Sequence, residues 1–239
     1  MTWRFALDIC ANLVGIPLEV LVLVAMLRGH YRRYPALFLY MSSVFVVSLV
    51  ETPLYVIGHL DIVRSGDRSL WSQYLKCYWI DERVLMGLVF VVVVSLIYQA
   101  TAKLRSRRLM RFAVILSAVL FPSAAFWIQY NPSVPTGQWM TAWTSNLNFC
   151  AAILDMGLWA MLIAARERDS RLLMFSGALG ILFTGAAIGE SVSNLAVARH
   201  SSTLTFLGGL VDILSNLTFL YVWWQALRVR EAGGRNVAA

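Results

Sequence analysis

The chain has 239 residues, of which 59% are hydrophobic and only 14% are charged, and its 20 Lys and Arg residues against 13 Asp and Glu residues give a formal net charge of +7. A soluble globular domain carries about 25% charged residues. Because the apolar residues also come in long uninterrupted runs, this composition excludes most soluble classes and indicates a polytopic membrane protein.

Seven apolar segments are long enough to cross a bilayer, since a helix rises about 1.5 Å per residue and the hydrocarbon core is about 30 Å thick. They cover residues 5–27, 36–60, 79–102, 110–128, 140–164, 172–196 and 203–227. The two longest connectors are residues 61–78 and 129–139. We therefore predict an all-α fold, a single seven-helix transmembrane bundle over residues 1–239 with no cleaved signal peptide, that ends in a short tail at residues 228–239.

The positive charge lies mostly in the short connectors, which is a topology signal and not a nucleic-acid-binding pattern. Most Lys and Arg residues follow the odd-numbered helices or precede the even-numbered ones, or lie in the tail. Because such residues resist translocation, we expect the N-terminus outside and the C-terminus in the cytoplasm. The arginine-rich segment 105–111 is also suited to contact anionic lipid headgroups. The partners we expect are the lipid bilayer and no nucleic acid.

Cofactor and metal chemistry has little support in the sequence. No Cys/His cluster is present, the three histidines do not fall at matching depths for a haem, and the last helix lacks the lysine that a retinal protein needs. We expect no cofactor, no metal and no enzymatic activity. Cys10 and Cys77 fall near the same membrane face, so both a disulfide and two free thiols are open, and free thiols are favoured.

Acidic residues occur in every predicted helix except the fourth. A carboxylate at mid-membrane costs about 2.5 to 3.5 kcal/mol on insertion scales, so these residues must face one another, water or a cation. The candidate ligand- or cation-binding residues are Glu19, Glu51, Asp155, Glu190, Asn194, Asp212 and Asn216, with Arg83 as an ion-pair partner. Three interpretations remain open: hydrogen bonds that fix helix packing, a cation or proton pathway, and a pocket for an organic ligand.

The acids also indicate a weak internal repeat. Glu19 and Glu51 lie on consecutive helices joined by an arginine-rich turn, and so do Asp155 and Glu190 at a similar spacing. Helices one to three and five to seven are therefore candidate parallel repeats around helix four. Small sugar and amino-acid transporters have this layout, but their proline–glutamine signature is missing here. Helix six additionally carries a GxxxG pair, which favours close helix packing.

The segment Tyr-Arg-Arg-Tyr-Pro-Ala-Leu-Phe at residues 31–38, together with Tyr78, Trp79 and Glu82, resembles a group of uncharacterised bacterial seven-helix membrane proteins. The resemblance extends over most of the chain, although its motifs are short. It implies a location in the bacterial inner membrane, and it implies no function and no site residues.

From the acidic interior we expect binding, and transport, of a small cation or a proton-coupled solute. The alternative is a non-catalytic receptor, sensor or accessory subunit that binds a membrane-protein partner or forms a homo-oligomer. The two alternatives differ in whether solute flux depends on the intramembrane acids.

Overall fold

A computed structural model describes residues 2–65, 69–101, 136–164, 170–199 and 201–228, together with positions 112, 116, 120, 123, 124 and 126–128. Within these residues the chain is helical and contains no strand. The helices are α1 (Thr2–Ala25), which continues as the π-helix η1 (Met26–His30), then α2 (Pro35–Ser65), α3 (Ser69–Ala100), α5 (Thr136–Ala164), α6 (Ser170–Arg199) and α7 (Ser202–Arg228).

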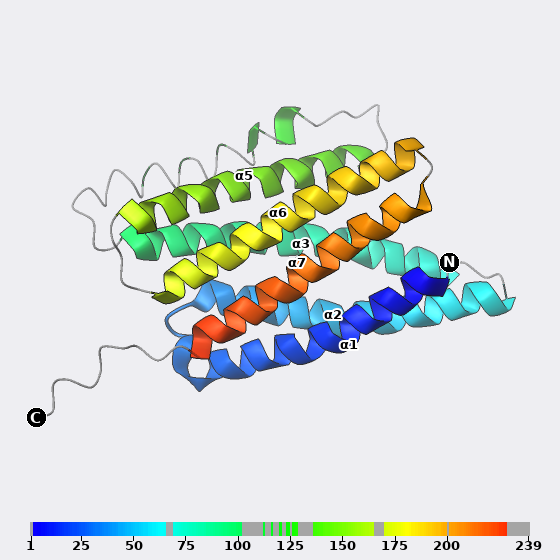
Figure 1. Ribbon diagram of the computed structural model, residues 1–239, viewed down its shortest axis with the longest axis horizontal. Helices are drawn as coiled ribbons and strands as arrows, with labels where there is room; N and C mark the ends of the chain where they lie inside the picture. Colours follow the sequence, from blue (N-terminus) through cyan, green and yellow to red (C-terminus); the bar gives the residue numbers. More distant parts are fainter. Residues whose placement is uncertain are drawn as a thin grey trace, which may run out of the picture.

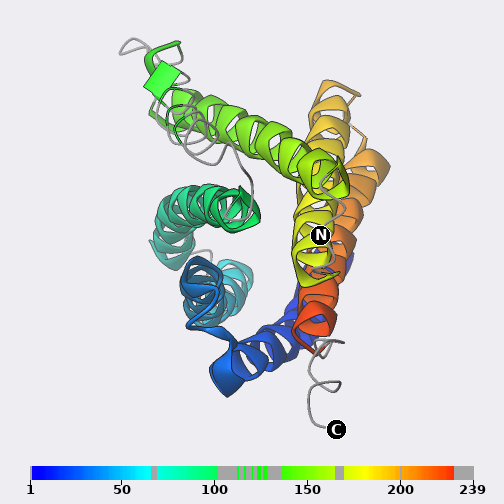
Figure 2. The ribbon, with the colours of Figure 1, turned by 90° about the vertical axis from the view of Figure 1, so that its left-hand side faces the viewer.

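The six long helices run side by side along the long axis of the molecule (Figure 1). Each packs against its neighbours in the order α1, α2, α3, α5, α6, α7, and α7 returns to α1. Viewed along the axis, they surround a common centre (Figure 2), and α3 also contacts α6. The fold is therefore a ring of helices, closed by its first and last members.

Five of these helices are long and apolar enough to span a membrane, and they contain Phe5–His30, Pro35–Asp61, Asn146–Ile163, Ser170–Ser193 and Ser202–Arg228. The predicted all-α class and the membrane environment are thus supported. The segment α3 is not among the five. The fourth predicted span, residues 110–128, lies mostly outside the described residues, so the count of seven spans remains a prediction.

One expected connector is wrong. Residues 61–78 do not form a long loop, because α2 continues to Ser65 and α3 already begins at Ser69. The backbone of Trp71 packs against Gly58, where a Cβ atom would lie 3.4 Å from the Trp71 nitrogen. Both helices are longer than their apolar cores because helical hydrogen bonding continues through polar residues, which a hydropathy scan does not count.

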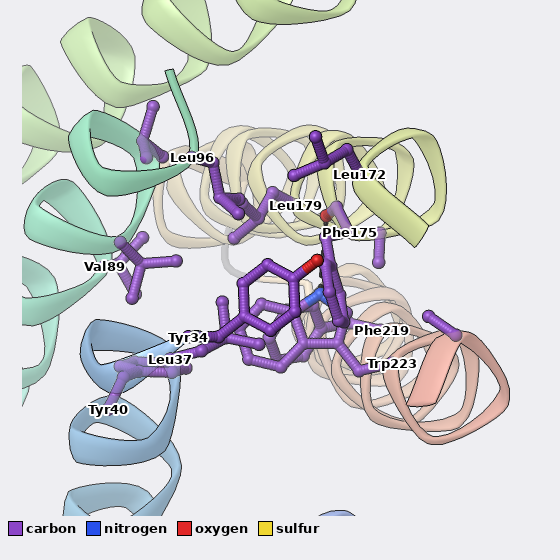
Figure 3. Packing of buried hydrophobic residues seen from close by; sticks show 14 of the residues in the cluster. Tyr34, Leu37, Tyr40, Val89, Leu96, Leu172, Phe175, Leu179, Phe219 and Trp223 are labelled. Carbon is purple, nitrogen blue, oxygen red and sulfur yellow. Dashed lines mark hydrogen bonds between the residues drawn. The ribbon is translucent and has the colours of Figure 1, made fainter. Parts of the chain in front are cut away.

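The apolar core lies toward one end of the ring, where aromatic side chains from three helices meet (Figure 3). Trp223 of α7 has no exposed surface; its ring lies 4.3 Å from that of Phe219 and 5.8 Å from that of Phe175 on α6, and its Nε1 donates a hydrogen bond to the Phe175 carbonyl oxygen at 3.4 Å. Tyr40 of α2 completes the group at 5.9 Å from Trp223. Edge-on aromatic contacts of this kind fix the relative rotation of α2, α6 and α7.

The pair α6 and α7 has the most intimate packing, because small residues face each other. A Cβ atom on Gly189 would lie 3.1 Å from the Gly208 carbonyl oxygen, and one on Gly208 would lie 2.6 Å from Ser193 Oγ. The GxxxG pair of α6, which is Gly185 and Gly189, thus lets the backbones of α6 and α7 come close together, as the sequence predicted for helix six.

The turn between α1 and α2 depends on one glycine. Gly29 has φ 123° and ψ −5°, a conformation that residues with a Cβ atom rarely adopt. We expect Gly29→Ala to lower the free energy of unfolding in detergent by about 1 to 2 kcal/mol through backbone strain, since nothing lies within 4 Å of the added methyl group.

The matched control for this variant is Gly157→Ala, which also adds a methyl group with nothing within 4 Å but lies inside α5. Thermal unfolding of both variants measures the difference. If Gly29→Ala melts at or above the temperature of Gly157→Ala, the turn does not need the glycine conformation.

Candidate functional site

The acidic side chains lie at two levels along the ring. We call one end of the ring the arginine-rich end, because five arginines lie there: Arg28, Arg32, Arg33, Arg171 and Arg228. By helical rise, Glu19 and Asp155 lie about 15 Å from the ends of their helices on that side. The acids of the upper acidic cluster, which is defined in the next paragraph, lie about 24 to about 30 Å from this end.

The upper acidic cluster consists of Glu51 on α2, Asp81 and Glu82 on α3, Glu190 on α6 and Asp212 on α7. Glu51 is close enough to Asp81 and Glu82 to interact electrostatically with both. Glu82 interacts in the same way with Glu190 and Asp212. Four helices therefore contribute carboxylates to a single region of the ring.

The electrostatic interaction between Glu82 and Asp212 spans the ring. In the ring order α3 and α7 are three places apart, on opposite sides (Figure 2). Carboxylates on the two helices can interact only when both are turned inward. The side chains of Glu190 and Asp212 are nevertheless exposed, and those of Glu51 and Glu82 are partly buried. The upper acidic cluster is thus accessible and is not packed into an apolar core.

Positive charge in this region comes from Arg83, whose guanidinium interacts with Glu82. Oε1 of Glu51 is buried and has no hydrogen-bond partner among the described residues. A buried carboxylate oxygen without a partner is costly unless it is protonated or bound by a cation.

The two lower acids are separate from this cluster and from each other. Glu19 of α1 is only 4% exposed, and its Oε1 accepts a hydrogen bond from Ser48 Oγ of α2 at 3.0 Å. Asp155 of α5 is 3% exposed, and its Oδ1 accepts a hydrogen bond from Ser176 Oγ of α6 at 2.9 Å. The structure thus does not gather all the predicted acids in one place.

The predicted asparagines have a smaller place in the site. Asn216 is exposed on α7, and the side chain of Asn194 lies outside the described part of the structure. Nearer the far end of the ring, Tyr55 donates a hydrogen bond to Asp8 Oδ2 at 2.8 Å. This contact joins α1 and α2 beyond the upper acidic cluster.

Two members of the cluster, Asp81 and Glu82, were not among the predicted site residues. The packing of α3 against α6 brings Glu82 within electrostatic range of Glu190. Tyr78, one turn before Glu82, also interacts with Glu82, Asp212 and Glu51. The signal available in the sequence was the i, i+4 spacing of Tyr78 and Glu82.

The arrangement of the described side chains also limits which ions the site can bind. Among the described residues no group of three or more His, Cys, Asp and Glu side chains is arranged to hold a metal ion. Cys10 and Cys77 are free thiols, which decides between the two alternatives left open by the sequence. The site suits protons, or cations that interact with carboxylates without being enclosed by them.

Comparison of the chain with protein-family models, with curated proteins and with solved structures finds no match.

Proposed function

We propose that this protein is a multi-pass protein of the bacterial inner membrane, with its N-terminus outside, that binds a small cation or a proton-coupled solute at the upper acidic cluster and carries it across the bilayer. The observation that carries the proposal is the convergence of Glu51, Glu82, Glu190 and Asp212 from four helices. Ordinary helix packing does not require acids from opposite sides of a ring to meet.

The charge balance explains why such a cluster would bind positive charge. Like-charged carboxylates that interact with one another disfavour simultaneous ionisation, and charge within a membrane-spanning helix adds to that cost. A proton or a cation removes the repulsion and supplies a partner for the buried Oε1 of Glu51. Because no three-carboxylate metal group exists among the described residues, an ion here would keep part of its hydration or be organic.

Thermal unfolding in mild detergent tests the proposal. The wild type and Glu51→Gln are compared between about pH 5 and about pH 8 and with sodium, potassium or magnesium. A species that binds only the folded state raises the melting temperature, by about 2.7 kcal/mol of stability at a hundred times its Kd. We expect one of these conditions to stabilise the wild type and not Glu51→Gln.

The matched control is Glu231→Gln, which makes the same change in the predicted tail and should respond like the wild type. Ion and proton flux in proteoliposomes is then measured for the three proteins, with flux expected in the wild type and in Glu231→Gln only. An equal response of all three proteins to every condition, with no flux, would contradict the proposal. A partner that co-purifies in that case would favour the receptor or accessory-subunit alternative.

A further inference from the structure

The two halves of the ring are arranged alike. The contacts run α1–α2–α3 in one half and α5–α6–α7 in the other, and the halves meet through α3 with α5 and through α7 with α1. Opposite members of the ring are therefore α1 and α5, α2 and α6, and α3 and α7 (Figure 2). In both halves the second and third helices form the most extensive contact. This is the arrangement expected of two parallel repeats related by an axis along the ring.

The two lower acids occupy equivalent places under this relation. Glu19 lies on the first helix of its half and Asp155 on the first helix of the other, both about 15 Å from the arginine-rich end. Each is almost fully buried, at 4% and 3% exposure. Each accepts one hydrogen bond from a serine on the following helix, Ser48 or Ser176. The two acids thus agree in helix order, level, burial and type of partner, although Ser48 lies 13 residues after the start of α2 and Ser176 lies six residues after the start of α6.

Each of the two sites has more hydrogen-bond acceptors than donors. The Ser48 hydroxyl donates to Oε1 of Glu19, whereas Oε2 of Glu19 is buried and has no hydrogen-bond partner among the described residues. Oδ2 of Asp155 faces Gly180, with 3.6 Å to the position that a Cβ atom there would take. On α5, two turns from Asp155, Asn148 Oδ1 is likewise buried and has no partner in the described part of the chain. A proton on each carboxyl group would reduce this deficit.

Few ionisable groups surround either site. The titratable side chain that interacts with Glu19 from α2 is Tyr40, which is itself buried. At this level the facing stretches of the neighbouring helices, residues 41–50 of α2 and 213–220 of α7, contain no titratable residue. The same holds for residues 172–189 of α6 and 84–97 of α3, which lie beside Asp155. No counter-charge from these stretches can hold the carboxylates ionised.

We propose that Glu19 and Asp155 are twin proton-acceptor sites, one in each half of the ring, and that Glu19 exchanges protons with the upper acidic cluster. The proposal rests on the proposed function and adds that the proton is the coupled ion. On α2, Glu51 is three residues from Ser48, which is about 4.5 Å along the helix axis, so the hydrogen-bond donor of the Glu19 site lies within one turn of the upper acidic cluster. When a proton arrives, one O–H bond forms on the carboxylate, which becomes neutral, and the serine hydroxyl remains a donor to the other oxygen.

The test uses the full chain in proteoliposomes and in detergent. Infrared spectra record the C=O stretching band of protonated carboxyl groups as the pH is varied, and a pH-sensitive dye inside the vesicles records proton flux. We expect Glu19→Gln and Asp155→Asn each to remove part of the protonated carboxyl band, and the double variant to remove both parts. Proton flux in the double variant should fall to the level of empty vesicles.

Conservative variants separate proton exchange from packing. Glu19→Asp and Asp155→Glu retain a carboxyl group, and we expect both to retain a pH-dependent band. If the amide variants leave the protonated carboxyl band unchanged, or leave proton flux at the wild-type value, the proposal of twin proton-acceptor sites is wrong. If Glu51→Gln abolishes the ligand response while Glu19→Gln and Asp155→Asn have no effect on band or flux, this inference fails and the proposed function stands.

Discussion

Replacing Gly185 with alanine is expected to destabilise the protein by about 3 kcal/mol, because the new methyl group falls on the Oγ and Cβ atoms of Ser215. Ser215 cannot turn away without losing its hydrogen bond, since its Oγ donates to the Val211 carbonyl oxygen at 2.8 Å. The helices α6 and α7 must move apart instead, and their packing is the most extensive in the ring. Thermal or denaturant unfolding in mild detergent measures the loss.

Two further variants make this prediction specific. Gly177→Ala lies on the same helix with nothing within 4 Å of the added atom, so we expect it to leave stability unchanged or to raise it by up to about 1 kcal/mol. Ser215→Gly removes both atoms that collide, so the double variant with Gly185→Ala should regain most of the lost stability. If the double variant is no more stable than Gly185→Ala alone, the collision with Ser215 is not the cause.

Trp223→Ala is expected to cost about 3 to 5 kcal/mol, the range for removing a large aromatic side chain from a packed core. Trp223 has no exposed surface, and its indole packs against Tyr40, Phe175 and Phe219 from three helices. In a membrane the loss comes mainly from the cavity and from lost dispersion contacts, because lipid is as apolar as the core. The variant should therefore loosen α2, α6 and α7 together.

The neighbouring residue Trp224 provides the control. It is only partly buried and its ring stacks beneath the Arg228 guanidinium at 4.6 Å, so Trp224→Ala should cost far less. Melting temperatures and near-ultraviolet circular dichroism of the two variants give the comparison. Equal losses for both variants would show that Trp223 does not hold the three helices together.

The six long helices that the structure describes overlap six of the seven spans predicted from hydropathy, while their lengths were not predictable. The connector expected at residues 61–78 is mostly helix because α2 and α3 extend through polar residues that no hydropathy window includes. The distribution of the acids was only partly predictable. The sequence shows Glu19 and Ser48 as polar residues inside predicted membrane spans, but their hydrogen bond depends on the rotation of α1 against α2, which side-chain packing sets.

The upper acidic cluster shows the same limit. Glu51, Glu190 and Asp212 were predicted as site residues from their depth, whereas Glu82 joins them because α3 contacts α6 across the ring. Contacts between helices that are distant in the sequence leave no periodic signal. Arg83 was the residue of α3 among the predicted site residues; the structure adds Asp81 and Glu82 from the same helix and places Asp155 and Glu19 apart from the cluster.

The contact between α7 and α1 has a consequence for biosynthesis. One flank of α1, including the buried Gly15 that packs against Leu217, is covered by α7, which is synthesised after α2, α3, α5 and α6. Before α7 is inserted, α1 can pack only against α2, and its other flank is exposed to lipid. The contact between α1 and α7 therefore forms only after α2, α3, α5 and α6 have been inserted, so the ring cannot close before α7 is in the membrane.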